Sequence, residues 1–378
     1  MVKYCDFAST TPVLPEVADF VVQLMCEQYG NSGSRTHKFG QDAKKCVNNA
    51  RKQIARASKF EPDEVIFTSG ATESNNLAFL GLRDHLFQTG RNHIISVKTE
   101  HKAVLEPLEH LAANGFEVTL LSPLSNGTID LNELSEAIHD RTGLISIMQV
   151  NNETGVIQPL DEVCELLNCS DVFLHVDAAQ GFGKIELPEN SHRIDLMSIS
   201  GHKIYAPKGI GALLSRKRNY QKLPLRPIMY GGGQEQGLRP GTLPVALIGG
   251  FGLAAELAFN EYISRTKIVK EALSSFIDAF ENVGGKINGE TSRLSPFIRN
   301  ISIPGLDAEA AMVILKEHIA VSNGSACTSA SYTHSHVLNA MSMPASEIES
   351  SIRFSFSHLS PPVDWKELFT KIRSVQLT

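Results

Sequence analysis

The stretch that decides the fold runs from Leu196 to Leu214 and reads LMSISGHKIYAPKGIGALL. Two apolar runs, 196–200 and 209–214, flank a short polar loop that carries Lys203. The loop leaves no room for a crossover helix, so the two runs should form antiparallel strands. A Lys at a buried strand end can lose its proton, and the neutral amine can then hold a carbonyl as a Schiff base. A snorkelling surface lysine is the competing interpretation.

Similar apolar, β-rich runs recur before this stretch. They are EVIFTSG (64–70), HIISV (93–97), EVTLL (117–121), LISIMQV (144–150), VFLHVD (172–177) and LMSIS (196–200). Their centres lie roughly 23 to 29 residues apart, which is the length of a strand plus a crossover helix. The sequence therefore predicts an α/β fold whose mostly parallel seven-stranded sheet contains one antiparallel strand.

The regular alternation of strands and crossover helices ends at about residue 260. Helices are expected at 268–280, 307–318 and 363–376, and strands at 297–304 and 350–357. At 378 residues the chain exceeds one ordinary core. We therefore predict a large domain over 14–260 and a smaller α/β domain formed by 1–13 and 261–378.

Composition excludes several classes of function. The net charge of −6 argues against direct binding of nucleic acid or of an anionic membrane. The apolar stretch 243–259 contains Pro244 and Glu256, so it predicts a buried helix rather than a membrane span. No secretory signal opens the chain, and six cysteines without C-x-x-C spacing predict reduced thiols in the cytoplasm and no metal site. All except Cys327 are interpreted as small buried hydrophobes.

Polar residues follow several of the predicted strands, where ligands bind in open α/β sheets. They are Ala71 and Thr72 in TSGATESNN, His101 in KTEHKAV, Asn152 in NNETG, Asp177 and Gln180 in DAAQ, and Ser200 and His202 beside Lys203. The main chain of Ala71 and Thr72 would form an anion cradle at a helix N-terminus. An Asp facing a pyridine nitrogen would keep it protonated. Alone, each could be an ordinary cap or a structural residue; together they predict one site for pyridoxal phosphate.

At this point the chain resembles a family. TSGATESNN, TEHKAV, NNETG, HVDAAQ, SGHKIYAPKGIGALL, GGGQEQGLRPGTLP, SNGSACTSAS and SSIRFS occur between about Tyr4 and Ser357. In order and spacing they resemble the cysteine desulfurases, class V aminotransferase-type enzymes of PLP fold type I, in the branch with a long catalytic-cysteine loop. The resemblance implies pyridoxal 5′-phosphate as cofactor, L-cysteine as substrate, and a homodimer with shared active sites.

The resemblance also implies roles for individual residues. Lys203 would bind the cofactor covalently, Asp177 would pair with the ring nitrogen, Gln180 would bond the phenolate oxygen and His101 would stack on the ring. Ala71, Thr72, Ser200 and His202 would hold the phosphate, and Thr242 would reach the phosphate in the other subunit. Asn152 and Arg353 would bind the substrate carboxylate, with Asn31 nearby. Lys203 would move the Cα proton, His101 would help to move the thiol proton, and Cys327 would take the sulfur as a persulfide.

The destination of the sulfur is the finer question. GNSGSRTH (30–37) and GGGQEQGLR (231–239) look more like desulfurases that serve DNA phosphorothioation than like housekeeping members, which carry HER in the glycine-rich loop. The acceptor would then be an iron–sulfur protein of the modification complex, with only indirect DNA contact. The alternative is a general sulfur donor for iron–sulfur cluster assembly or tRNA thiolation. A transaminase, a selenocysteine-specific lyase and a non-catalytic scaffold are further alternatives, and the Cys327 segment disfavours the transaminase.

Overall fold

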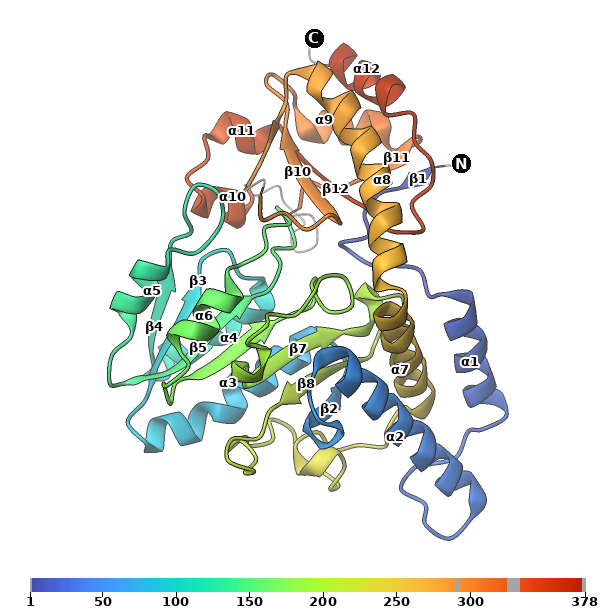
Figure 1. Cartoon of the computed structure of the whole chain (residues 1–378), viewed down its shortest axis with the longest axis vertical. Coiled ribbons are helices and arrows are strands. Elements are labelled where there is room, and N and C mark those ends of the chain that lie inside the picture. The colour runs from blue at the N-terminus through green and yellow to red at the C-terminus, as the bar shows by residue number, and fades with distance from the viewer. Residues whose placement is uncertain (1, 290–291, 325–333, 376–378) are drawn as a thin grey trace.

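The computed structural model describes residues 2–289, 292–324 and 334–375. Its larger part surrounds a seven-stranded sheet and its smaller part, above it in Figure 1, a three-stranded sheet. The large sheet consists of β2 (Val65–Thr68), β3 (His93–Val97), β4 (Glu117–Leu121), β5 (Thr142–Met148), β6 (Phe173–Asp177), β7 (Leu196–Ser200) and β8 (Gly211–Ser215). The strand order is β2-β8-β7-β6-β5-β3-β4.

β8 is the reversed strand. It pairs antiparallel with both β2 and β7, whereas the remaining neighbours are parallel, which confirms the predicted sheet. β7 and β8 pair from Leu196 opposite Ser215 to Ser200 opposite Gly211, and a 3₁₀ turn, η3 (Gly201–Lys203), follows β7. A side chain at Gly211 would come within 2.6 Å of the Gly70 Cα. Glycine at this position therefore lets β8 pass directly beside the start of helix α3 (Ala71–Gln88).

Helices cover both faces of the sheet because its strands alternate between two cores. Val65 and Phe67 of β2 join one core, and Ile66 between them joins the other. α3 and α4 (Lys102–Ala113) cover the Ile66 side. The opposite face is covered by α1 (Pro15–Cys26), α2 (Lys38–Ser58), α5 (Leu131–Ala137), α6 (Leu160–Leu166) and α7 (Val245–Asn260).

The helix expected at 243–259 is confirmed as α7, with Ile248 and Phe251 fully buried. It packs against α1 and α2 as part of the core. Across the described residues, we find no helix whose length and apolar character would let it cross a membrane.

The smaller part contains the antiparallel sheet β12-β10-β9, formed by β9 (Lys286–Ile287), β10 (Ile298–Ser302) and β12 (Ser351–Ser355). Its helices are α8 (Tyr262–Phe280), α9 (Ala308–Leu315), α10 (His336–Ala340), α11 (Ala345–Glu349) and α12 (Trp365–Val375). Phe276 of α8 is the hub of its core, with the ring centroids of Phe354 and Trp365 5.1 and 5.0 Å away. The helices and strands predicted after residue 260 are confirmed; the exact domain limits stay a prediction.

The N-terminal segment joins the two parts. β1 (Lys3–Tyr4) pairs with β11 (Ile319–Ala320), and the Ala8 N–H donates to the Ser355 hydroxyl at 2.9 Å. Three residues later the Thr11 N–H donates to the carbonyl of His202, at 3.1 Å. Residues 5–11 therefore run from the small sheet to the loop that carries Lys203.

The cysteine prediction is partly wrong. Cys5 and Cys164 are buried as expected, and burial raises the pKa of each thiol to about 12. Cys46 is half-buried, but Cys26 and Cys169 are exposed. The physical reason is position: Cys26 is the last residue of α1 and Cys169 lies in the turn after α6, so neither faces a core.

Candidate active site

A cavity of about 800 Å³ lies at the carboxyl ends of β6 and β7. The structure brings most of the predicted site residues to its wall. They are Ala71, Thr72, His101, Asn152, Asp177, Gln180, Ser200, His202, Lys203 and Arg353. Gly324, His334 and Arg353 come from the smaller part, so the cavity lies between the two parts of the chain.

Lys203 is held at the cavity wall by main-chain oxygens. Its Nζ donates to the carbonyls of Ala8, at 2.5 Å, and Ser9, at 2.7 Å. These two residues belong to the N-terminal segment, which sequence reasoning did not connect with the site. Lys203 is half-buried and its amine donates two hydrogen bonds, which is inconsistent with a lysine that snorkels to the surface.

Asp177 ends β6 with its carboxylate fixed from two sides. Oδ1 accepts from the Ala179 N–H at 2.9 Å, and Oδ2 accepts from the Asn75 amide at 2.8 Å. Asn75 was missed at the sequence level, although it lies in the TSGATESNN motif. One helical turn after Ala71, it faces the sheet, so helical periodicity was the available signal.

The other end of the cavity suits an anion. The first N–H groups of α3 have no partner within the helix, and the helix dipole adds positive potential there. Ser200 and His202 line the same cavity. The His202 Nδ1 lies 3.1 Å from the Thr10 hydroxyl. Burial, together with the positive charges of Lys203, Lys208 and Lys184, lowers the His202 pKa to about 4, so the ring is neutral at neutral pH.

His101 caps α4 and lines the cavity at once. Its Nδ1 accepts from the Ala103 N–H at 3.0 Å, so the neutral ring carries its proton on Nε2. Burial and the nearby Lys203 charge lower its pKa, against the opposing effect of Asp177. The His101 ring is therefore neutral and presents its N–H at Nε2. This state is compatible both with a cap of α4 and with stacking on the cofactor ring.

Arg353, on β12, is 2% exposed, and part of its guanidinium group is hydrogen-bonded within the chain. Nη1 donates to the Asn152 carbonyl at 2.8 Å, and Nη2 donates to the Asp6 carboxylate and the Ser9 hydroxyl, each at 2.8 Å. Its Nε has no partner among the described residues. The predicted carboxylate-binding side chain thus has N–H groups left for a ligand.

Two buried carboxyl groups beside the cavity were not assigned a role from the sequence. Glu100 accepts from the Met148 N–H at 2.5 Å, and burial next to Asp177 raises its pKa well above its ordinary value. Glu153 accepts from the Ser335 hydroxyl at 2.5 Å, and burial raises its pKa too. Both acids lie in the segments that follow buried strands, Glu100 after β3 and Glu153 after β5, and this position was the available signal.

Two of the predicted residues, Asn31 and Thr242, are not brought into the cavity of the single chain. Asn31 is exposed and accepts from the Gly33 N–H at 2.8 Å. Thr242 is exposed as well, and its expected role concerns the other subunit, so it stays a prediction. Cys327 lies outside the described residues. However, Gly324 and His334, which border the segment containing Cys327, both line the cavity.

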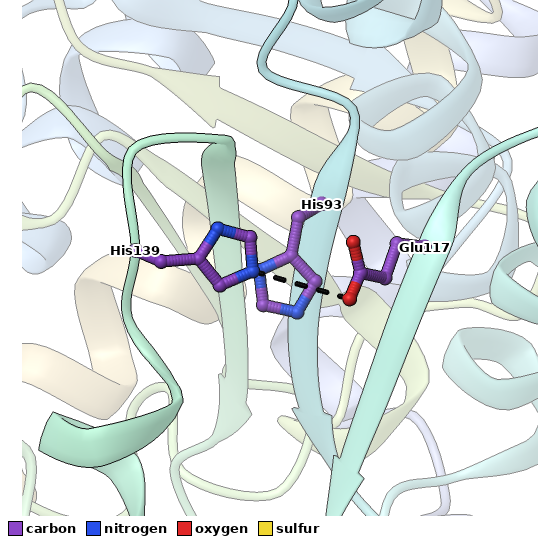
Figure 2. Close-up of side chains that lie close together, drawn as sticks. All are labelled: His93, Glu117 and His139. Atoms are coloured by element: carbon purple, nitrogen blue, oxygen red, sulfur yellow. Dashed lines mark ion pairs between the residues drawn. The ribbon is translucent and has the colours of Figure 1, made fainter.

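A second cluster of titratable groups lies at the opposite, amino-terminal edge of the sheet. Figure 2 shows His93, Glu117 and His139, whose nearest ligand atoms lie within 4.8 Å of one another. The two imidazoles are stacked, with centroids 4.2 Å apart and planes 12° apart, so one ion cannot lie in both ring planes. Both nitrogens of His93 also contact threonine hydroxyls, at 2.8 and 2.9 Å. This geometry favours a structural role over metal binding.

The cavity fits pyridoxal phosphate. Its volume is that of a small-molecule site. The α3 N-terminus, Ser200 and His202 offer neutral donors to a phosphate, and Asp177 offers a fixed carboxylate to a ring nitrogen. Lys203 supplies the amine between them. The donor set therefore matches both ends of the cofactor.

The comparisons with known proteins agree with this geometry. The family model for aminotransferase class-V matches residues 3–366. The chain is 45% identical to the cysteine desulfurase IscS of Rickettsia bellii (strain OSU 85-389) over 359 residues, covering 94% of this chain and 87% of the relative. It is 47% identical to the crystal structure of DndA from Streptomyces lividans (TM-score 0.81, covering 92% and 98%). It is 34% identical to a structure of SspA in complex with cysteine (TM-score 0.84, covering 95% and 100%).

These matches span nearly the whole chain. The chain belongs to the class V aminotransferase family and, within it, to the cysteine desulfurases, which use pyridoxal phosphate. The predicted fold class, enzyme class and cofactor are thereby confirmed.

Proposed function

We propose that this chain converts L-cysteine to L-alanine and carries the removed sulfur as a persulfide on Cys327. The observation that carries the proposal is one cavity that joins Lys203 and Arg353 to Gly324 and His334. Cys327 follows Gly324 by three residues in the sequence. A site built only for amino transfer needs no thiol there.

The chain's own residues divide the work of proton transfer and binding. Pyridoxal phosphate, when bound, holds the substrate amine covalently and withdraws electron density from its Cα. Asp177, oriented by Asn75, holds a proton at the ring nitrogen. The amine of Lys203, anchored by the Ala8 and Ser9 carbonyls, takes the Cα proton and returns it. Arg353 binds the substrate carboxylate through its remaining N–H groups, with Asn152 beside it.

The sulfur step needs a thiolate and no outside oxidant. The thiolate of Cys327 attacks the sulfur of cysteine, so an S–S bond forms while the Cβ–S bond breaks. The electron pair of the broken bond stays with Cβ, and a proton completes the methyl group of L-alanine. The proton that the Cys327 thiol gives up on becoming a thiolate balances this step, and His101, which lines the cavity, is proposed to help to move it.

The proposed acceptor is a protein of iron–sulfur cluster assembly or tRNA thiolation, reached in the cytoplasm. Relatives named IscS at 43–45% identity support this general sulfur-donor role over the phosphorothioation subgroup that the sequence motifs favoured. DNA phosphorothioation is the second candidate, because GNSGSRTH and GGGQEQGLR resemble that subgroup. Sulfur delivery to a cluster scaffold that carries free cysteine thiols, given ferrous iron and L-cysteine, tests the first candidate. No cluster formation, with transfer instead to an iron–sulfur protein encoded beside this gene, would favour the second.

We further propose a homodimer in which Thr242 contacts the partner's cofactor phosphate. Its exposure in the single chain supports this arrangement. Mixing Thr242→Ala with Lys203→Ala subunits tests it, because a mixed dimer contains one site in which both residues are native. Recovery of activity on mixing is expected, and no recovery with demonstrated subunit exchange would contradict shared sites.

The reaction itself is tested by measuring L-alanine and sulfide from L-cysteine with a reductant present. Equal amounts of both products are expected. Cys327→Ser should bind the cofactor normally and release neither product catalytically. Sustained alanine formation by that variant would overturn the proposed role of Cys327.

A further inference from the structure

Lys184 is a buried lysine that lies behind Gln180, a residue of the cavity wall. It follows β6, is 7% exposed and does not line the cavity. None of the ion pairs between described residues includes Lys184. Its Nζ donates a 3.2 Å hydrogen bond to the Oε1 of Gln180, four residues earlier in the turn that follows β6. A buried cation without a counter-ion is costly, so its presence needs a reason.

Gln180 provides that reason through the orientation of its amide. Its Nε2 donates to the carbonyl of Ala8 at 2.8 Å, and a carbonyl can only accept. Its Oε1 accepts from Lys184 Nζ, and the ammonium form of Lys184, which predominates below about pH 7, can only donate. Both neighbours therefore demand the same orientation of the amide. In that orientation the amide oxygen is turned to Lys184, and one N–H of Nε2 remains uncommitted.

The same carbonyl ties this pair to the catalytic lysine. Ala8 O accepts from Gln180 Nε2 and also from Lys203 Nζ. Gln180 lines the cavity with Lys203 and Asp177. A flipped amide would place two oxygens, Oε1 and Ala8 O, in repulsive contact, and would present an acceptor where the cofactor's phenolate oxygen needs a donor.

We propose that Lys184 is a positioning residue that acts through Gln180: it locks the amide so that an N–H, rather than the oxygen, meets the phenolate oxygen of the bound cofactor. The inference rests on the proposed function, because the contact of Gln180 with that oxygen is assigned there. The inference adds to the site Lys184, a residue that does not itself contact the cofactor.

The test is a double-mutant cycle on cofactor binding without cysteine. Lys184→Met, Gln180→Ala and the double variant are titrated with pyridoxal phosphate, recording the dissociation constant and the visible absorption maximum. Each single variant should weaken binding about 10- to 100-fold, the value of one hydrogen bond to a charged oxygen. The double variant should resemble Gln180→Ala alone, because Lys184 has nothing left to orient. Lys184→Arg, which keeps a cationic donor, should retain the wild-type absorption maximum more closely than Lys184→Met.

Lys208 provides the matched control. It also lines the cavity and places its charge near His202, but the Gln180 amide is bonded to Ala8 and Lys184 instead. Lys208→Met should weaken cofactor binding by the same factor with or without Gln180. If Lys184→Met behaves likewise and remains additive, Lys184 acts by charge alone and the inference is wrong. If Gln180→Ala changes neither binding nor spectrum, the assignment of Gln180 fails together with the inference, whether or not the chain desulfurates cysteine.

Discussion

Replacing Lys184 by Met should stabilise the cofactor-free protein while it weakens the cofactor site. Burial, with the added repulsion of Lys203, lowers the pKa of the Lys184 ammonium from 10.5 to about 7. The unfolded chain keeps the ordinary value, so folding at pH 7 works against the charged form. Each pKa unit corresponds to about 1.4 kcal/mol, which sets the cost at pH 7 to about 4 kcal/mol. Met fills a similar space without that cost.

The sign of the pH dependence follows from proton binding. Between pH 7 and 10.5 the unfolded state binds more protons at this position than the folded state, so the stability of the wild-type protein rises with pH. The cost is fully present below about pH 7 and absent above 10.5. The stability advantage of Lys184→Met should therefore fall from about 4 kcal/mol at pH 7 to about 2 kcal/mol at pH 9.

Urea unfolding of both cofactor-free proteins at the two pH values, at one protein concentration, measures this advantage. Lys270→Met, an exposed lysine of α8, is the control and should change stability by less than about 0.5 kcal/mol. A Lys184→Met protein that is no more stable than the wild type at pH 7 would refute the reasoning. So would an advantage that does not shrink at pH 9.

Three further substitutions test the cavity. Arg353→Ala should raise the KM for L-cysteine about 10- to 100-fold, because a charge-assisted bond to the substrate carboxylate is lost; an unchanged KM in steady-state kinetics would contradict that role. Asp177→Asn should lower kcat about 100-fold or more, since an amide cannot hold a proton at the ring nitrogen, and a kcat within a few-fold of wild type would argue against it. Asn75→Ala should cause a smaller loss, about 10-fold, through the freed carboxylate of Asp177; a loss as large as that of Asp177→Asn would point instead to a disrupted fold.

Much of the fold was predictable because strand spacing and loop length are local properties. The ten-residue loop between β7 and β8 leaves no room for a crossover, so their antiparallel pairing follows directly. The insertion of β8 between β2 and β7 does not follow, because it depends on contacts between distant residues, such as the close approach of Gly211 to Gly70.

The positions of site residues were predictable where each lies at or just after the end of a strand that the sequence itself predicts. Asp177 and Lys203 are set by β6 and β7, and they meet because the ends of neighbouring strands meet. The Ala8 and Ser9 carbonyls were not predictable, since main-chain oxygens carry no side-chain signal and reach the site from the other end of the chain. Lys184 was missed for a related reason: its burial depends on tertiary packing, whereas a lysine in sequence is usually exposed.

The most direct test of the central claim is the location of the sulfur after one exposure to L-cysteine without reductant. Mass spectrometry of the digested protein should find one added sulfur atom on the peptide that contains Cys327, and none in the Lys203→Ala protein. The exposed thiols of Cys26 and Cys169 provide the internal comparison. Sulfur on those peptides with Cys327 unmodified would contradict the account, as would catalytic release of alanine with no persulfide on any cysteine.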